Sequence, residues 1–232
     1  MILKKWEQLP PEMQCGEVRD YYERLQAHKG GIALKRAFDF TASAVLLLAL
    51  SPAFLGISVA VALDSKGGVF FCQERVTKYN KHFRIIKFRT MVPNAEKLGS
   101  QLTTSNDMRI TKVGHFLRNS RLDELPQLIN ILTGDMSFVG TRPEVPKYVA
   151  QYTPEMLSTL LLPAGVTSEA SIRYKDEYRL LNEAEDVDEV YVKKVLPDKM
   201  RYNLKAIEEF SVLNELMTMI RTVLAVCGKD YK

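Results

Sequence analysis

A run of 24 residues without a charged side chain, Phe40 to Leu63, is the feature that most limits how this chain can fold. At ~1.5 Å per residue a helix of this length reaches roughly 36 Å, which is enough to cross a hydrocarbon core of ~30 Å. The sequence therefore predicts a membrane segment.

Ser51 and Pro52 divide this segment near its midpoint, leaving arms of about 11 residues that each match roughly half of the hydrocarbon core. Pro52 cannot donate to the carbonyl of Leu48, so the helix is expected to bend there, and the Ser51 hydroxyl can bond to a carbonyl one turn earlier. Cations flank both ends of the segment, so the positive-inside rule assigns neither end to the outside. These features raise the question of a re-entrant helix, but membrane helices tolerate proline when neighbours satisfy the freed backbone groups, so the residues alone favour a proline-kinked spanning anchor.

The rest of the chain has the composition of a globular protein, with 46% hydrophobic and 26% charged residues. Lys+Arg minus Asp+Glu is 32 − 28 = +4, which is too slight an excess to indicate nucleic-acid binding. The cysteines, Cys15, Cys72 and Cys227, are far apart and show no CxxC spacing, so neither a zinc site nor a disulfide framework is indicated.

Two stretches rich in β-branched and aromatic residues, 69–75 and 82–90, are separated by a polar turn at 77–81 and predict a β-hairpin. Alternation along the second strand places Lys87 and Arg89 on one face, which fits either an anion site or a solvated strand edge. Further along, residues 207–227 carry an apolar stripe at helical spacing. This amphipathic helix can pack into a core or lie at a membrane interface.

The acidic pair Asp123 and Glu124 precedes an apolar helical pattern, and Pro126 fits the first turn of that helix. The helix is therefore predicted to begin near Asp123, where free N–H groups and the helix dipole would keep the carboxylate ionised and allow a phosphate to bind alongside. Arg118 and Arg121 add positive charge, and Arg142 follows in a tight loop. An ionised carboxylate beside a phosphate site suits a nucleophile that accepts a phosphoryl group.

A structural interpretation of the same residues is favoured by the pattern alone. Ser120 and Asp123 have the spacing of a capping box, and acidic residues are favoured in any first helical turn. Residues 11–28 read as a polar helix closed by Gly30 and Gly31.

Seven ordered motifs together resemble the monotopic phosphoglycosyl transferases, a family of bacterial sugar transferases. They are Lys35 to Asp39, the apolar segment with Ser51-Pro52, Phe70 to Arg75, Lys87 to Met91, Arg109 to Arg118, Leu122 to Leu128 and Gly134 to Pro143. The resemblance is close from about residue 33 to residue 146 and looser beyond.

The resemblance implies an enzyme that transfers a sugar phosphate from a UDP-sugar to a polyprenyl phosphate such as undecaprenyl phosphate, with release of UMP. It implies that Asp123 is the covalent nucleophile and that Glu124 helps to position Mg²⁺. Lys35 and Arg36 match the family's basic pair and are expected to face lipid headgroups or the polyprenyl phosphate. We assign Lys87, Arg89, Arg118 and Arg142 to phosphate contacts.

We therefore expect an α/β protein, mostly helical with a small β-hairpin, that inserts a re-entrant helix and interfacial amphipathic helices into one leaflet. The expected divisions are an N-terminal extension (1–31), the membrane helix (32–66), a catalytic domain (67–206) and a C-terminal amphipathic helix of the same globular unit (207–232). The expected location is the bacterial inner membrane, with the catalytic domain on the cytoplasmic face and no nucleic-acid partner.

Three departures from the family pattern leave the transferred sugar open: Thr141 in place of proline, residues 162–168, and residues 171–177. Two rival functions also stay open. One is a noncatalytic membrane-anchored assembly protein that uses Asp123 as a helix cap, and the other is a phosphotransferase of the soluble type on a spanning anchor.

Overall fold

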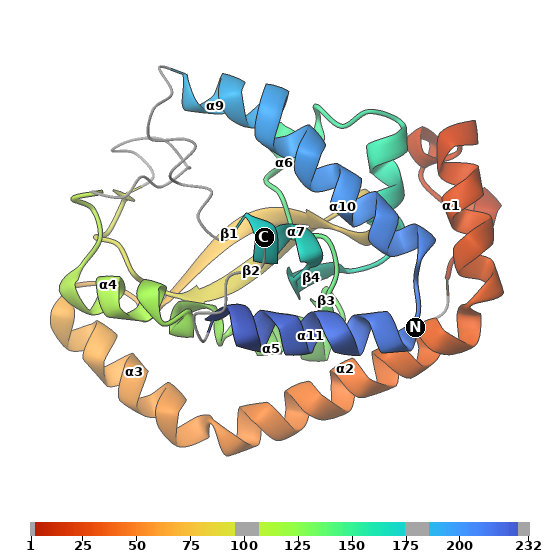
Figure 1. Ribbon diagram of the computed structural model, residues 1–232. Coiled ribbons are helices and arrows are strands. Elements are labelled where there is room, and N and C mark those ends of the chain that lie inside the picture. Colours follow the sequence, from red (N-terminus) through yellow and green to blue (C-terminus); the bar gives the residue numbers. More distant parts are fainter. Residues whose placement is uncertain (1–2, 96–106, 175–185, 227–232) are drawn as a thin grey trace.

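The computed structural model describes residues 3–95, 107–174 and 186–226, and it is mostly helical with two small sheets (Figure 1). The longer helices are α1 (Gly16–Ala27), α2 (Lys29–Ala49), α3 (Ser51–Asp64), α4 (Lys112–Asn119), α5 (Gln127–Thr133), α10 (Leu196–Glu208) and α11 (Val212–Val226). The short ones are α6 (Pro146–Val149), α7 (Glu169–Arg173), α9 (Val187–Val190) and the π-helix η7 (Tyr191–Val195). The 3-10 turns are η1 (Trp6–Gln8), η2 (Pro11–Met13), η3 (Lys78–Asn80), η5 (Leu122–Glu124) and η6 (Glu155–Leu161). The prediction of a mostly helical α/β protein is confirmed.

The apolar segment forms two helices, α2 and α3, that are bent by 63° at Leu50. Pro52 lies in the first turn of α3, and the Ser51 hydroxyl donates to the carbonyl of Leu48 at 2.8 Å, as the sequence predicted. Within the described ranges, no single helix is both long enough and apolar enough to cross a bilayer, whereas this bent pair meets both requirements when its arms are counted together.

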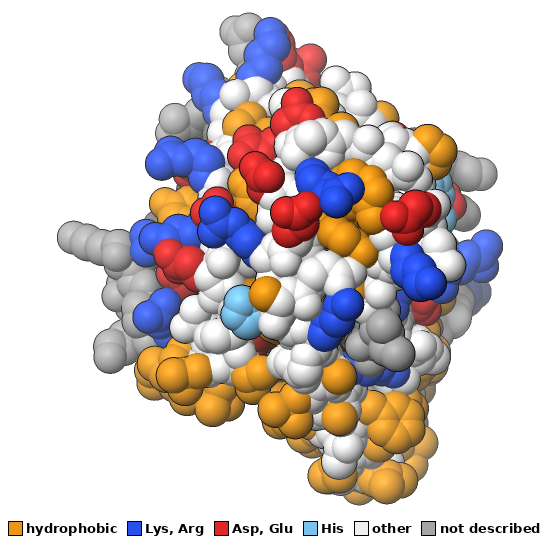
Figure 2. Space-filling model, turned by 90° about the vertical axis from the view of Figure 1, so that its right-hand side faces the viewer, with side chains coloured by type: hydrophobic (Ala, Val, Ile, Leu, Met, Phe, Trp, Pro, Cys, Tyr) orange, Lys and Arg blue, Asp and Glu red, His pale blue; other side chains and the backbone are white. Residues whose placement is uncertain are grey.

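Apolar side chains of the bent pair remain exposed to solvent. Leu48 is 77% exposed, Leu55 68% and Leu63 84%, although side chains of this type normally lie in the interior. Figure 2 shows hydrophobic side chains gathered along the lower edge of the molecule, where α2 and α3 lie in Figure 1. Such a continuous patch is typical of a surface that contacts a membrane or another protein.

The residues before α2 and the residues after α3 belong to one packed body. Val18 on α1 and Val76 on the first strand lie in the same buried cluster. The Lys4 backbone N–H donates to the Tyr79 hydroxyl at 3.1 Å, and Asn80 donates to Glu12 at 2.9 Å. Both ends of the bent pair therefore return to the same side of the molecule.

The N-terminal segment differs from its prediction as a polar helix closed by Gly30 and Gly31. α1 ends at Ala27, and Gly30 and Gly31 lie inside α2 instead of closing the helix before it. One face of α1 is apolar and packs against η6 and α10, with Leu25 fully buried. The boundary at residue 31 stays a prediction, but the segment before it contributes to the main core.

The predicted hairpin is confirmed as β1 (Phe70–Thr77) paired antiparallel with β2 (Lys81–Phe88), with Arg75 opposite Phe83. A second sheet, which the sequence did not reveal, pairs β3 (Met136–Val139) with β4 (Ala164–Thr167) in parallel. Just beyond the end of β3, the backbone at Gly140 lies very close to the backbone at Gly165 on β4. A Cβ atom on Gly165 would lie only 2.1 Å from the Gly140 nitrogen. Only glycine fits at such an approach.

The C-terminal stripe is not one helix. α10 ends at Glu208 and α11 begins at Val212, so Phe210 turns inward and is 4% exposed while Leu213 on α11 is 67% exposed. Cys227 lies outside the described residues. The apolar face of α11 is largely exposed, and this helix contacts α2 (Figure 1). It extends the exposed apolar surface of the bent pair.

Candidate active site

The acidic pair lies in the 3-10 turn η5, between α4 and α5. Arg121, just before this turn, has a φ of 58° in the left-handed region, which redirects the chain into the turn. α5 begins only at Gln127, so the prediction that this helix starts near Asp123 is wrong by about one turn. The physical reason is that Pro126, the N-cap residue of α5, has no N–H to donate to the Leu122 carbonyl, which instead accepts a 3-10 bond from the Leu125 N–H.

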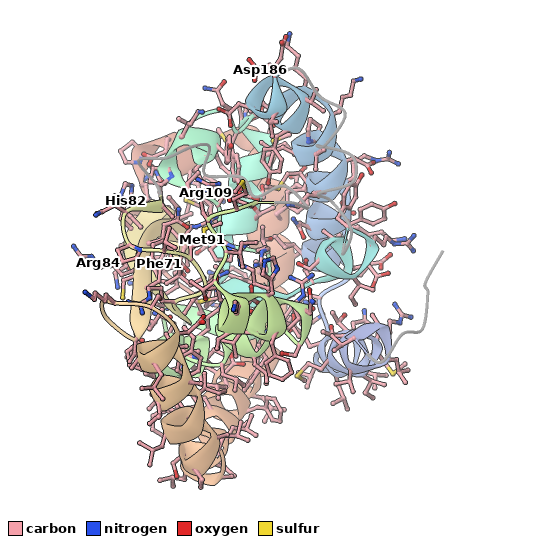
Figure 3. The ribbon with its side chains drawn as sticks, turned by 90° about the vertical axis from the view of Figure 1, so that its left-hand side faces the viewer. Phe71, His82, Arg84, Met91, Arg109 and Asp186 are labelled. Atoms are coloured by element: carbon pink, nitrogen blue, oxygen red, sulfur yellow. The ribbon has the colours of Figure 1, made fainter. Side chains whose placement is uncertain are left out.

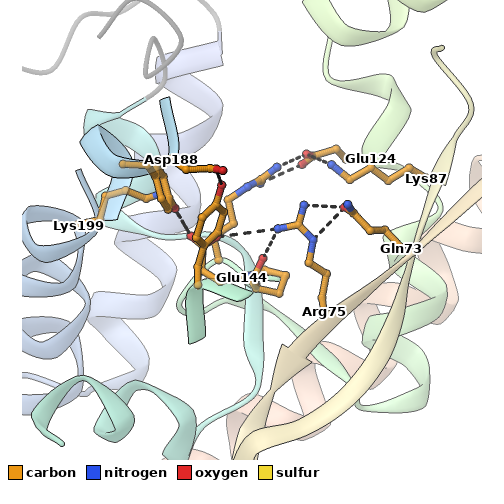
Figure 4. A network of polar contacts seen from close by, with 11 residues as sticks. Gln73, Arg75, Lys87, Glu124, Glu144, Asp188 and Lys199 are labelled. Atoms are coloured by element: carbon orange, nitrogen blue, oxygen red, sulfur yellow. Dashed lines mark hydrogen bonds and ion pairs between the residues drawn. The ribbon is translucent and has the colours of Figure 1, made fainter. Parts of the chain in front are cut away.

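Glu124 is held by two cations from different parts of the chain (Figure 4). Its Oε1 accepts from Lys87 Nζ at 3.0 Å and from Arg142 Nη2 at 2.5 Å, while its Oε2 has only a 3.5 Å contact with Arg142 Nη1. Burial disfavours the charged form of Glu124, but Arg142 and Lys87 outweigh burial and lower its pKa. Glu124 is therefore ionised at neutral pH.

Asp123 lies beside this ion pair and is 8% exposed. Burial and the neighbouring Glu124 raise its pKa, and Lys87, Arg118 and Arg121 counteract that rise. Within the described residues its carboxylate accepts no hydrogen bond. A poorly solvated carboxylate without hydrogen bonds is more nucleophilic than one held by donors, because hydrogen bonds stabilise its charge.

The helix-cap interpretation of Ser120 and Asp123 is wrong. The Ser120 hydroxyl donates back to the carbonyls of Phe116 and Leu117 at the end of α4. Neither η5 nor α5 has a side-chain cap bond, so Asp123 is buried without satisfying a helix terminus. Its burial is consistent with a chemical function and is not explained by capping.

Arg118 approaches the acidic pair from the end of α4. Its Nε donates to the Thr90 hydroxyl at 2.8 Å. Burial lowers the pKa of Arg118, and the negative charge of Asp123 opposes that effect. The structure therefore brings Lys87, Arg118 and Arg142 together around Asp123 and Glu124, while their contacts with phosphate stay a prediction.

Arg89 does not join this group. Its Nη2 donates to the Ser65 carbonyl at 2.6 Å, to the Ser65 hydroxyl at 3.0 Å and to the Val61 carbonyl at 3.3 Å, at the end of α3. The expectation that Lys87 and Arg89 project together is wrong, because β2 ends at Phe88 and the strand alternation stops there. Arg89 instead binds the C-terminal end of α3, the second helix of the bent pair.

Lys35 and Arg36 attach α2, the first helix of the bent pair, to the rest of the protein. Arg36 donates to the Ile131 carbonyl at 2.6 Å and to the Leu132 carbonyl at 2.8 Å, at the C-terminal end of α5. Lys35 donates to the Val139 carbonyl at 2.8 Å and pairs with Glu215 on α11. Their expected contact with headgroups or a polyprenyl phosphate stays a prediction, and their protein partners give both cations a structural role.

Sequence reasoning gave no role to several residues around the site. Asn130 on α5 accepts from the Ile86 N–H at 3.0 Å and donates to the Arg84 carbonyl at 2.9 Å, so it fixes α5 against β2. Gln127 is 1% exposed, and its amide has no hydrogen-bond partner in the described part of the chain. A polar side chain within an otherwise apolar helical pattern was the available signal for both.

Mg²⁺ in proteins commonly binds one or two carboxylates together with substrate phosphates. The described residues form no cluster of three or more His, Cys, Asp or Glu side chains. Two carboxylates, Asp123 and Glu124, are adjacent, and Glu124 Oε2 keeps acceptor capacity because its one contact is long. These carboxylate oxygens are chemically compatible with Mg²⁺, and a bound ion stays a prediction.

The fold thus combines two features: an acidic pair surrounded by cations, and a neighbouring pair of helices with exposed apolar side chains. The model of the bacterial sugar transferase family matches residues 30–229, and the chain belongs to that family.

Three relatives illustrate the similarity. The chain is 33% identical over 196 residues to the UDP-N-acetylgalactosamine-undecaprenyl-phosphate N-acetylgalactosaminephosphotransferase of Aeromonas hydrophila, covering 83% of this chain and 43% of that protein. It is 37% identical over 195 residues to the UDP-glucose:undecaprenyl-phosphate glucose-1-phosphate transferase of Escherichia coli (strain K12), covering 82% and 39%. It is 31% identical over 213 residues to the exopolysaccharide production protein ExoY of Rhizobium meliloti (strain 1021), covering 85% and 87%. The match thus spans less than half the length of the first two relatives and most of the third.

Proposed function

We propose that this chain transfers a sugar 1-phosphate from a UDP-sugar to undecaprenyl phosphate or a related polyprenyl phosphate and releases UMP, as the first membrane step of polysaccharide or glycoconjugate synthesis. Family membership and the names of the relatives support the reaction class. The observation that carries the proposal is Asp123, a buried carboxylate that accepts no hydrogen bond from the described part of the chain and lies beside a carboxylate neutralised by two cations.

The reaction proceeds in two displacements at one phosphorus atom. A carboxylate oxygen of Asp123 attacks the phosphorus that bears the sugar, the bond from that phosphorus to the UMP oxygen breaks, and UMP leaves. An oxygen of the lipid phosphate then attacks the same phosphorus and breaks its bond to Asp123. The products are the polyprenyl diphosphate sugar and the free Asp123 carboxylate.

The cations around the pair hold and stabilise negative charge. Lys87 and Arg142 keep Glu124 ionised beside Asp123, and Arg118 supplies positive charge from the last turn of α4. Preorganised cations of this kind stabilise the charge that develops on transferring phosphoryl oxygens. Mg²⁺, bound through Glu124 and the substrate diphosphate, would neutralise the diphosphate charge.

We also propose that α2 and α3 enter one leaflet of the bacterial inner membrane and turn back, with the catalytic domain on the cytoplasmic face. The exposed apolar side chains of α2, α3 and α11 support insertion, since exposure of these groups to water is unfavourable. The packing of Lys4 and Tyr79 supports the re-entrant path, because a spanning pass would place the two ends of the pair on opposite sides of the bilayer. The site then lies at the depth where a lipid phosphate is presented.

UMP release tests the proposed reaction. The full chain in detergent micelles is mixed with Mg²⁺, undecaprenyl phosphate and a panel of UDP-sugars, and UMP is quantified. We expect release with at least one sugar nucleotide, loss of release in Asp123→Asn, and unchanged release in Asp20→Asn, which removes an exposed acid on α1. Normal turnover of Asp123→Asn would show that another group is the nucleophile, and silence of the wild type with every sugar would favour the noncatalytic assembly protein.

Cysteine labelling in intact cells tests the topology separately. Cysteines are placed at the exposed positions Lys5 and Lys66, on either side of the bent pair, in a chain whose native cysteines are replaced. The re-entrant path predicts that a membrane-impermeant reagent labels both positions only after the cells are opened. Labelling of one position from outside and the other from inside would support the spanning anchor.

A further inference from the structure

The loop that contains Arg142 is held in place by a hydrogen bond from Arg75 on β1. Arg75 Nη1 donates to the Pro143 carbonyl at 3.0 Å, one residue beyond Arg142 (Figure 4). Its Nε and Nη2 both donate to Gln73 Oε1, at 3.1 and 2.7 Å. The guanidinium is thus held in one orientation by Gln73, with its remaining arm directed at the loop.

The same loop is fixed from the other side at Glu144. The Tyr191 hydroxyl donates to Glu144 Oε1 at 2.5 Å, and Lys199 Nζ lies 3.5 Å from the same oxygen. The Val76 N–H donates to the Glu144 carbonyl at 3.0 Å, and Arg75 lies 4.0 Å from Glu144 Oε2. Arg142 therefore projects from a segment whose next two residues are anchored to β1 and to η7.

Arg75 lies among other charged groups that act on its pKa. Burial lowers the pKa of Arg75, Glu144 raises it, and the nearby Arg142 lowers it. Two guanidinium groups brought close together repel each other, and the carboxylates of Glu144, near Arg75, and of Glu124, paired with Arg142, oppose this repulsion. The hydrogen bonds of Arg75 go to Gln73 and Pro143, and Glu124 is close enough for its negative charge to raise the pKa of Arg75.

We propose that Arg75 is a positioning residue for the transferase site: it holds the Pro143 carbonyl so that the Arg142 guanidinium meets Glu124. Only the expected loss of kcat in UMP release rests on the proposed function. The structural consequence, a fixed loop at 140–146, holds whatever reaction the site performs.

A double-mutant cycle separates positioning from a general structural effect. UMP release is measured for Arg75→Gln, Arg142→Gln and the combined variant, each in the full chain. A residue that acts through Arg142 loses its effect when Arg142 is already gone. We expect Arg75→Gln to lower kcat about tenfold alone and less than about twofold in the Arg142→Gln background, by the non-additivity of contacting residues.

Arg84→Gln is the matched control, since Arg84 is exposed on β2 of the same hairpin and points away from the body of the molecule (Figure 3). It should leave kcat unchanged. Gln73→Ala removes the group that orients Arg75 without touching the Arg75 charge, and it should give a smaller loss than Arg75→Gln. Losses that multiply in the combined variant of Arg75 and Arg142 would overturn the proposal.

Hydrogen–deuterium exchange provides a readout that does not need activity. Peptides covering residues 140–146 should exchange faster in Arg75→Gln than in the wild type and unchanged in Arg84→Gln, with peptides from α1 as the check on folding. Unchanged exchange at 140–146 in a folded Arg75→Gln variant would overturn the inference even if the wild type released no UMP. Absence of UMP from the wild type together with faster exchange would defeat the proposed function and leave the positioning role intact.

Discussion

Replacing Glu124 by Gln tests whether the ion pairs at the site stabilise the fold. Glu124 is 11% exposed and faces Lys87, which is 21% exposed, and Arg142, which is 33% exposed. Removing one partner of a fully buried pair costs ~3–5 kcal/mol. Because solvent reaches Arg142 and a glutamine still accepts hydrogen bonds, we expect a smaller loss of about 2–3 kcal/mol. For a chain of this size that loss lowers Tm by roughly 4–12 °C.

The assay is thermal unfolding in detergent at pH 7, with Glu74→Gln as the matched control. Glu74 is 62% exposed and pairs with His82, which is 52% exposed, so its loss should change stability by less than about 1 kcal/mol. Equal Tm values for Glu124→Gln and the wild type would refute the claim that these cations are held by Glu124.

The pH dependence of this difference has a defined sign. The folded-state pKa of Glu124 lies below its ordinary value of 4.5 because Arg142 and Lys87 outweigh burial. A carboxylate with a lowered pKa contributes stability that is present above the unfolded value and is lost as pH falls toward the folded value. The Tm difference between Glu124→Gln and the wild type should therefore be constant between pH 6 and 8 and shrink below about pH 4.5. A difference that grows as the solution is acidified would contradict this assignment.

Three further changes test the packing around the site. Arg36→Gln removes two donors from the last carbonyls of α5 and should lower the free energy of unfolding by about 1–3 kcal/mol in chemical denaturation. Gly165→Ala places a Cβ 2.1 Å from a backbone nitrogen and should greatly reduce the folded yield, whereas Gly56→Ala, which meets nothing within 4 Å, should not. Leu213→Asp on the exposed face of α11 should reduce the fraction of protein that sediments with lipid vesicles, and an unchanged fraction would remove α11 from the membrane interface.

The parts of the fold that follow from local chemistry could be predicted from the sequence. The bend at Ser51 and Pro52 follows from a missing N–H and a hydroxyl within reach of Leu48, all within one turn. The hairpin follows from two β-rich stretches and a polar turn. Arg118 was expected near the acidic pair from its position in the sequence, and the structure also places Lys87 and Arg142, which were selected with the family resemblance, around that pair. Their contacts with phosphate stay a prediction.

The roles of the other cations depend on contacts that no local pattern encodes. Arg36 contacts carbonyls 95 and 96 residues away, and Lys35 contacts Val139. Arg89 was predicted to share a face with Lys87, but it returns to the end of α3 because β2 stops at Phe88. Such pairings depend on how separate elements pack, and the sequence alone does not determine them.

The local interpretation of Asp123 failed for a related reason. Ser120 and Asp123 have the spacing of a capping box, yet Ser120 donates to the preceding helix instead. Spacing specifies which bonds are possible, and the backbone turn at Arg121 decides which one forms.

Intact-protein mass spectrometry tests the central claim most directly. The chain is mixed with Mg²⁺ and a UDP-sugar that supports UMP release, without the lipid acceptor, and is then quenched and weighed. We expect a mass increase equal to one phosphosugar, mapped to Asp123 by peptide sequencing, absent from Asp123→Asn and lost when undecaprenyl phosphate is added. Lipid product that accumulates without any such adduct, or an adduct mapped to another residue, would contradict it.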